Sequence, residues 1–85
     1  MEFEWDESKR QSLISERELD ILKAARIFEG PVTTQVDLRR DYGETRFISL
    51  GIFDDVAYFV VHTARHGVTR LITAWKGGRN GKRRY

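Results

Sequence analysis

The sequence predicts an α+β domain in which two N-terminal helices pack on a four-stranded antiparallel sheet. Residues 44–76 hold most of the apolar and aromatic side chains, in three runs rich in Ile, Val, Phe, Tyr and Thr that short polar turns separate. Such runs are typical of consecutive antiparallel strands. Residues 19–28 instead carry apolar side chains at helical spacing. A chain of 85 residues without repeats or linkers predicts a single domain, residues 1–85.

The first helix is predicted over residues 7–17, with mostly polar faces. Residues 3–5 are interpreted as a short extended segment before it. Asp6 occupies the position at which an N-cap accepts a hydrogen bond from the first turn.

The second helix is predicted from about residue 19 or 20 to residue 28, with its apolar face against the sheet. That face consists of Ile21, Ala25 and Phe28. Gly30 is expected as a left-handed C-cap, and Pro31 cannot continue the helical hydrogen bonds.

Four strands are expected after the helices, over residues 32–38, 47–53, 57–63 and 68–75. Asp54-Asp55 and His66-Gly67 are predicted to close the two hairpins of the last three strands, because tight hairpin turns favour Asp and Gly. The strand over residues 32–38 is expected at one end of the sheet. A short basic C-terminal segment follows Gly77-Gly78.

The charge of the chain is unevenly distributed, although the net charge is only +2. The N-terminal twenty residues have an acidic excess, whereas residues 76–85 contain five basic residues and no acid. This asymmetry favours an anionic partner, nucleic acid being the commonest, and a solvated tail is the equally weighted alternative. The absence of cysteine, of a signal peptide and of a long apolar run predicts a cytoplasmic protein without a membrane partner.

No metal site or cofactor is expected from the sequence. The two histidines, His62 and His66, have neither helical nor zinc-finger spacing, and Gly77-Gly78 lacks the pattern of a phosphate-binding loop. His62 lies in an apolar strand, so a buried and hydrogen-bonded histidine is expected there. Trp5 and Trp75 are expected to pack in the core or at an interface.

Charged residues on or beside the predicted strands are the candidates for chemistry. Strand alternation places Glu44 and Arg46 on one face, where an acid and a permanent cation can act on one phosphate. A surface ion pair between them is the simpler alternative. Arg65 and Arg70 flank the His66-Gly67 turn, and charges on edge strands also discourage aggregation.

Several motifs together resemble the BrnT family of type II toxins. They are F-E-W-D at residues 3–6 with Lys9, D-x-R-x-x-Y-G-E-x-R at residues 37–46, and R-x-I-T-A at residues 70–74 before a basic run that ends in Tyr85. The resemblance covers nearly the whole chain.

The resemblance implies a RelE-like fold and a metal-independent ribonuclease that inhibits translation. It implies a BrnA-type antitoxin as partner, and operator DNA contacted through that antitoxin. The family's catalytic positions correspond to Glu44 as the proton-handling or orienting acid and to Arg46 and Arg70 as phosphate clamps. The RNA-binding positions are expected at Lys9, Arg65, Lys76, Arg79, Arg83 and Tyr85.

The sequence departs from the family pattern at three places. The family's K-H-G after the first helix is Glu16-Arg17-Glu18 here, its S-A-R is Thr73-Ala74-Trp75, and Gly81 replaces an acid in the basic run. Loss of a histidine and of a clamp arginine favours an alternative function: a catalytically weakened relative that acts as a protein-binding module in a DNA-binding toxin–antitoxin complex. A third hypothesis is an unrelated RNA-binding domain that uses the basic segment.

Overall fold

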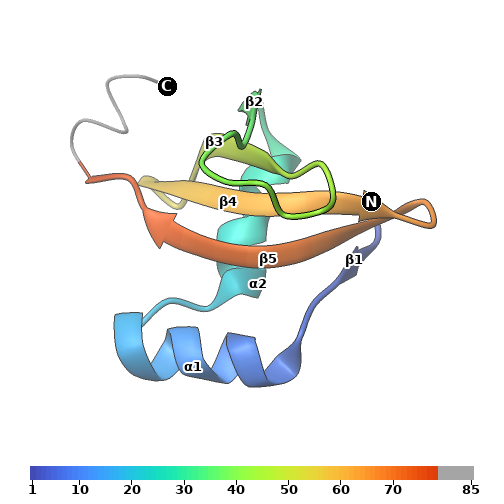
Figure 1. The fold of residues 1–85 in the computed structure, drawn as a ribbon. Helices are drawn as coiled ribbons and strands as arrows, with labels where there is room; N and C mark the ends of the chain where they lie inside the picture. The colour runs from blue at the N-terminus through green and yellow to red at the C-terminus, as the bar shows by residue number, and fades with distance from the viewer. Residues whose placement is uncertain (79–85) are drawn as a thin grey trace.

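The computed structural model describes residues 1–78, and they form a five-stranded sheet with helices on one side (Figure 1). The strand order is β1-β5-β4-β3-β2. The elements in chain order are β1 (Phe3–Glu4), α1 (Glu7–Arg17), α2 (Ile21–Ala24), the 3-10 helix η1 (Ala25–Glu29), β2 (Thr33–Val36), β3 (Phe47–Phe53), β4 (Val56–Arg65) and β5 (Val68–Lys76).

The predicted α+β class is confirmed, but the prediction of a four-stranded antiparallel sheet is wrong. β1 adds a fifth strand that pairs parallel with β5, with Phe3 opposite Thr69 and Glu4 opposite Arg70. The remaining three strand pairs are antiparallel. A two-residue strand carries no alternating pattern of its own, so its pairing depends on β5, more than sixty residues later in the chain.

The first helix has the predicted bounds, and the Asp6 side chain caps it by accepting a hydrogen bond from the Lys9 backbone N–H at 3.0 Å. The second predicted helix is shorter. After one turn of α2, the chain tightens into η1, in which Gly30 N–H bonds the Ile27 carbonyl at 3.1 Å. Gly30 is extended, with φ −126°, so the prediction of a left-handed C-cap is wrong.

Both predicted hairpin turns are confirmed. Asp54 and Asp55 have φ values of 52° and 62°, and His66 and Gly67 have φ values of 53° and 78°. Positive φ at both central residues matches the right-handed twist of the flanking strands. β3 has the predicted bounds, whereas β4 and β5 extend slightly beyond theirs. The predicted strand over residues 32–38 is β2, which forms one edge of the sheet.

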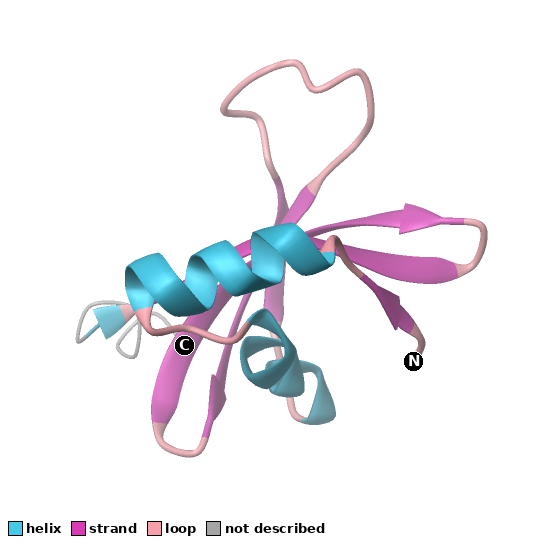
Figure 2. Cartoon of the chain, turned by 90° about the horizontal axis from the view of Figure 1, so that it is seen from below, coloured by secondary structure: helices cyan, strands magenta, loops and turns pink. Residues whose placement is uncertain are grey.

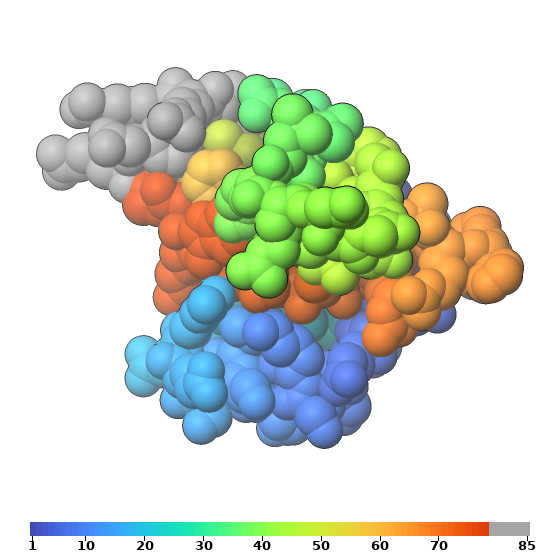
Figure 3. Space-filling view, viewed as in Figure 1, coloured from blue at the N-terminus to red at the C-terminus, as the bar shows by residue number. Residues whose placement is uncertain are grey.

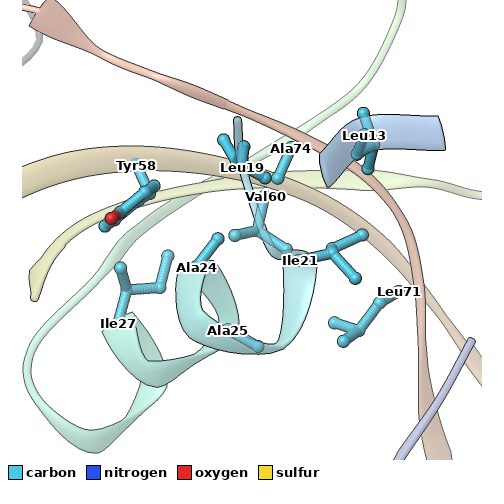
Figure 4. Packing of buried hydrophobic residues seen from close by; sticks show 10 residues of the cluster. All are labelled: Leu13, Leu19, Ile21, Ala24, Ala25, Ile27, Tyr58, Val60, Leu71 and Ala74. Atoms are coloured by element: carbon cyan, nitrogen blue, oxygen red, sulfur yellow. The ribbon is translucent and has the colours of Figure 1, made fainter. Parts of the chain in front are cut away.

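The hydrophobic core lies between the helices and one face of the sheet (Figure 4). Leu13 from α1, Ile21 from α2, Ile27 from η1, Val60 from β4 and Leu71 from β5 meet there and are almost completely buried. The face of the sheet toward these helices is called the inner face below. The opposite, outer face carries no helix, and the long loop of residues 37–46 lies on its side of the sheet (Figure 2).

A β-bulge in β5 changes which side chains reach the outer face. Val61 pairs with Thr73, but His62 pairs with Leu71, so Ile72 is an extra residue in β5. Uninterrupted alternation from the buried Ala74 would turn Arg70 toward the core. The bulge instead turns Leu71 inward and Arg70 outward, where Arg70 pairs with Thr63 of β4.

No helix within residues 1–78 is both long and apolar enough to span a membrane.

Candidate functional site

Asp37 organises the loop of residues 37–46. Its side chain is buried and accepts hydrogen bonds from the Arg39 backbone N–H at 3.1 Å, from Arg39 Nε and Nη2 at 2.8 and 2.9 Å, and from the Tyr42 hydroxyl at 3.0 Å. The Arg39 guanidinium, together with the Tyr42 hydroxyl, holds the pKa of Asp37 far below its usual range. Asp37 is therefore a carboxylate that joins the start of the loop to its middle.

The end of this loop places Glu44 and Arg46 beside each other. The Asp37 backbone N–H donates to the Arg46 carbonyl at 2.8 Å, which closes the loop next to β3. The Arg46 guanidinium lies over the Tyr42 ring, 4.1 Å from its centroid, and Arg46 Nε donates to Glu44 Oε2 at 3.0 Å. The ion pair considered from the sequence alone thus forms, but the prediction that strand alternation places the two residues on one face is wrong, because both lie in the loop before β3.

Further ion pairs extend from Glu44 across the outer face. Arg65 Nη2 lies 3.8 Å from Glu44 Oε1, and Arg65 Nε lies 4.0 Å from Glu4 Oε1. The same Glu4 oxygen lies 3.5 Å from Arg70 Nη1. Acids and arginines therefore alternate from Arg46 to Arg70. Pairs as exposed as these contribute little to stability, so their main consequence is to hold the side chains in place.

The ion pairs border a cleft of about 320 Å³, called the cation cleft below. The loop of residues 37–46 with β4 and β5 contributes most of its charged lining, and the start of α1 contributes the rest. In Figure 3 the blue N-terminal segment, the green loop and the red β5 come together on the face toward the viewer. The lining residues are Asp6, Lys9, Glu44, Arg46, Arg65, Arg70, Leu71 and Ile72.

A second hollow, of about 480 Å³, adjoins the cation cleft and shares three lining residues with it: Lys9, Arg46 and Ile72. Its other lining residues are Arg39, Arg40, Tyr42 and Thr73, and it is called the arginine hollow below. Among residues 1–78, the two hollows together have six basic lining residues and two acidic ones, Asp6 and Glu44. This excess of positive charge attracts polyanions such as nucleic acid.

The structure brings together five of the nine residues predicted for catalysis or RNA binding. Glu44, Arg46, Arg70, Lys9 and Arg65 all line the cation cleft. Lys76 lies at the far end of β5, opposite Tyr58, and does not line it. Arg79, Arg83 and Tyr85 lie outside the described residues.

Neither histidine lines the cation cleft or the arginine hollow. His62 points to the inner face, where its Nε2 lies 2.7 Å from Ser49 Oγ and its ring contacts Phe28 and Phe47. The predicted hydrogen bond is thus confirmed, but His62 is half-buried rather than buried, and this partial burial lowers its pKa. Within residues 1–78, no three His, Asp or Glu side chains are grouped as metal ligands would be.

Sequence reasoning missed Glu4 as a site residue. Its Oε1 atom is shielded from solvent and has no hydrogen-bond donor among the described residues, although two arginines lie within 4.0 Å. The one sequence feature that could have identified Glu4 is the presence of an acid in the extended segment before α1. The sequence does not reveal that this segment pairs with β5.

The sequence model of one protein family matches residues 5–80 of the chain. That family is described as the ribonuclease toxin, BrnT, of type II toxin–antitoxin systems. No curated protein matches the chain.

Proposed function

This chain belongs to the BrnT family of type II ribonuclease toxins, and we propose that its cation cleft cleaves RNA without a metal ion. One observation carries the proposal: the loop of residues 37–46 and the strands β4 and β5 direct Glu44, Arg46, Arg65 and Arg70 into one cleft. The resemblance in sequence independently assigns catalytic roles to three of these four residues, Glu44, Arg46 and Arg70.

In the proposed reaction, the 2′-hydroxyl of one nucleotide attacks the adjacent phosphate. The new bond joins the 2′-oxygen to phosphorus, the bond from phosphorus to the 5′-oxygen breaks, and the products carry a 2′,3′-cyclic phosphate and a 5′-hydroxyl. The Glu44 carboxylate accepts the proton from the 2′-hydroxyl, and the departing 5′-oxygen takes a proton from water or from Lys9. Arg46 and Arg70 stabilise the negative charge that develops on the phosphorane.

The distances between these groups support this division of roles. Glu44 Oε2 accepts a hydrogen bond from Arg46 Nε at 3.0 Å. The carboxylate and this guanidinium therefore lie at the same place in the cleft. Arg65 lies between Glu44 and Glu4. Its guanidinium is therefore suited to keep both carboxylates in position at the surface that binds RNA. Lys9 reaches the cleft from α1, the opposite side from the loop.

The direct test is cleavage of a short RNA by the purified chain in the presence of a metal chelator. Arg70→Ala and Glu44→Gln are each expected to slow cleavage by roughly 100- to 1000-fold. The control is Arg26→Ala, because among residues 1–78 Arg26 forms its ion pair with the exposed Glu29 and packs on Phe53, and it does not line the cleft. An RNA with a 2′-deoxy sugar at the cleaved position should resist cleavage. Equal rates for all four proteins would contradict the assignment of the cleft.

The proposal extends to the cellular role. The family implies an antitoxin partner. We propose that RNA cleavage in the cytoplasm inhibits translation, that a BrnA-type antitoxin neutralises the toxin, and that this antitoxin carries the complex to operator DNA. Expression of the chain alone in bacteria should arrest growth, and coexpression of the protein encoded by the neighbouring reading frame should restore it.

A specific observation favours the second candidate, a weakened relative that acts through protein binding. No histidine lines the cation cleft, and Arg17, at the position of the family's histidine, donates to the Ala74 carbonyl at 3.0 Å. Arg17 thereby satisfies a carbonyl on the open edge of β5 and has no proton to exchange at neutral pH. Normal growth on expression, with intact RNA and a stable antitoxin complex, would select this candidate.

A further inference from the structure

We propose that an apolar hollow on the outer face is a nucleobase subsite, which holds one base of an RNA strand whose phosphates lie in the cation cleft and the arginine hollow. The hollow has a volume of about 430 Å³, and its lining residues are Thr33, Gln35, Ile48, Leu50, Phe59 and Trp75. It is called the aromatic hollow below. The inference rests on the proposed function, because it requires that RNA binds in the cleft.

The register of the sheet shows how the aromatic hollow is built. Thr33 pairs with Leu50, Leu50 with Phe59, and Phe59 with Trp75, so these four residues form one row across four strands. Their side chains share the outer face, since directly paired residues point the same way. A flat ligand in the hollow would lie on aliphatic side chains, between an aromatic pair and the polar side chains of β2.

The two aromatic residues provide the stacking surface. The rings of Phe59 and Trp75 lie 5.4 Å apart between centroids at an interplanar angle of 21°, an offset stacked pair. Trp75 thus lies outside the hydrophobic core, stacked on Phe59, and it also lines the aromatic hollow. Aromatic side chains bind bases of any identity by stacking. Such a pair can bind any nucleobase. Polar groups at the edge of the base must then distinguish one base from another.

Polar side chains that can recognise the edge of a base lie on β2. Thr33 and Gln35 are exposed and line the hollow. The Gln35 amide offers both donors and an acceptor, and the Thr33 hydroxyl offers either, which matches the mixed groups on the edges of unpaired RNA bases. An apolar hollow without a ligand would not require these two polar side chains in its lining.

The aromatic hollow adjoins the positive hollows. The next row of the sheet contains Gln35, Ile48, Val61 and Thr73, and Thr73 also lines the arginine hollow. Consecutive rows on one face are about 7 Å apart. The Arg39 guanidinium lies 5.3 Å from the Trp75 ring centroid and lines the arginine hollow as well. Phosphate and base of neighbouring nucleotides thus have adjacent binding surfaces.

A protein segment added to the free edge of β2 is the competing occupant of an apolar hollow. The base is favoured because the aromatic hollow lies beside the arginine hollow, whose lining includes Lys9, Arg39, Arg40 and Arg46. The charge of that cluster complements the RNA backbone.

The test uses short 2′-O-methyl RNA oligonucleotides, which bind but lack the attacking hydroxyl. Each intact oligonucleotide is compared with versions in which one base at a time is replaced by an abasic sugar. For the unmodified chain, removal of the base that occupies the hollow should weaken binding by roughly 10-fold. Trp75→Leu should remove this difference while the salt dependence of binding is unchanged, and Trp5→Leu, the matched control, should retain it.

Gln35→Ala provides a second variant whose folding is not in doubt, because Gln35 is exposed. It should retain the thermal stability and the salt-dependent affinity of the unmodified chain but change which base is preferred. Equal affinity of the unmodified chain for intact and abasic oligonucleotides, or an unchanged base preference in both variants, overturns the subsite and leaves the hollow to a protein partner. Failure of every oligonucleotide to bind with salt-dependent affinity overturns the proposed function as well.

Discussion

Glu4 on β1 stands directly opposite Arg70 on β5, and its Oε1 atom lies 3.5 Å from Arg70 Nη1. The same oxygen lies 4.0 Å from Arg65 Nε, so one carboxylate from the start of the chain orients two arginines of the cation cleft. Glu4 does not line the cleft itself and is therefore a positioning residue.

Glu4→Gln is accordingly expected to lower kcat for RNA cleavage by roughly 10- to 100-fold, because small displacements of catalytic groups have effects of this size. KM should stay unchanged or fall, since removal of a negative charge strengthens attraction of RNA. Steady-state kinetics on a short RNA measures both constants. Glu2→Gln is the control, and equal kcat values for the two variants would exclude a role for Glu4 in positioning.

Asp37→Asn should detach the loop of residues 37–46 from its anchor. The neutral amide no longer attracts Arg39 as a carboxylate does, and its NH2 group cannot accept the hydrogen bonds that one carboxylate oxygen accepts now. Glu44 and Arg46 then lose their fixed positions, and cleavage should slow by at least about 10-fold. Asp41→Asn in the same loop is the control, since Asp41 accepts only from the Gly43 backbone N–H among the described contacts. A similar rate for both variants would show that the loop needs no anchor.

Gly51→Ala tests the close packing of η1 on β3. A Cβ atom at this position would lie 2.8 Å from Ile27 Cβ and 3.0 Å from Val32 Cγ1, so the helix must move away from the sheet. The expected destabilisation is about 1 to 3 kcal/mol in the free energy of unfolding, measured with urea. Gly30→Ala is the matched control, because a Cβ there meets no atom within 4 Å and the backbone is extended. Equal stability of the two variants would contradict the packing.

Glu18→Gly should stabilise the protein by about 1 kcal/mol. Glu18 ends α1 in the left-handed region, with φ 53°, where glycine is free of the steric cost of a Cβ. Glu16→Gly, inside the helix, should have the opposite effect and destabilise by about 1 kcal/mol. Thermal unfolding of both variants distinguishes the positions, and a lower melting temperature for Glu18→Gly would refute this interpretation of the helix end.

Acid should destabilise the fold through His62. Burial lowers the pKa of His62 in the folded protein below its ordinary value of 6.5, so the unfolded chain binds more protons than the folded one as the pH falls below that value. The stabilisation is present above pH 6.5 and is lost as the pH falls through the folded-state pKa. Urea unfolding across this range should show a slope that His62→Gln removes. His66→Asn, in the exposed turn, should leave the slope intact.

Much of the local structure was predictable from the sequence, and the reason is that its determinants are close together in the chain. The bounds of α1 follow from the Asp6 cap, and those of β3 from a run rich in aromatic and β-branched residues. The hairpin turns follow from residue types that tolerate positive φ. The same proximity explains why the motif of residues 37–46 pointed to Glu44 and Arg46, which are two residues apart.

Other features depended on contacts between distant segments. No local pattern predicts that Glu4 pairs with a strand more than sixty residues later, or that α2 gives way to a 3-10 helix against Gly51. The placement of Arg70 is the clearest case. Regular alternation would bury it, and only the bulge at Ile72, which lets Leu71 enter the core, turns Arg70 outward.

The sequence by itself thus determined the fold class, the order of the two helices and of four of the five strands, the hairpin turns and the identity of the charged candidates. The tertiary structure decided which of those charges share a cleft. A period-two pattern specifies the side of a strand only until the register changes, and register is set by packing across the sheet.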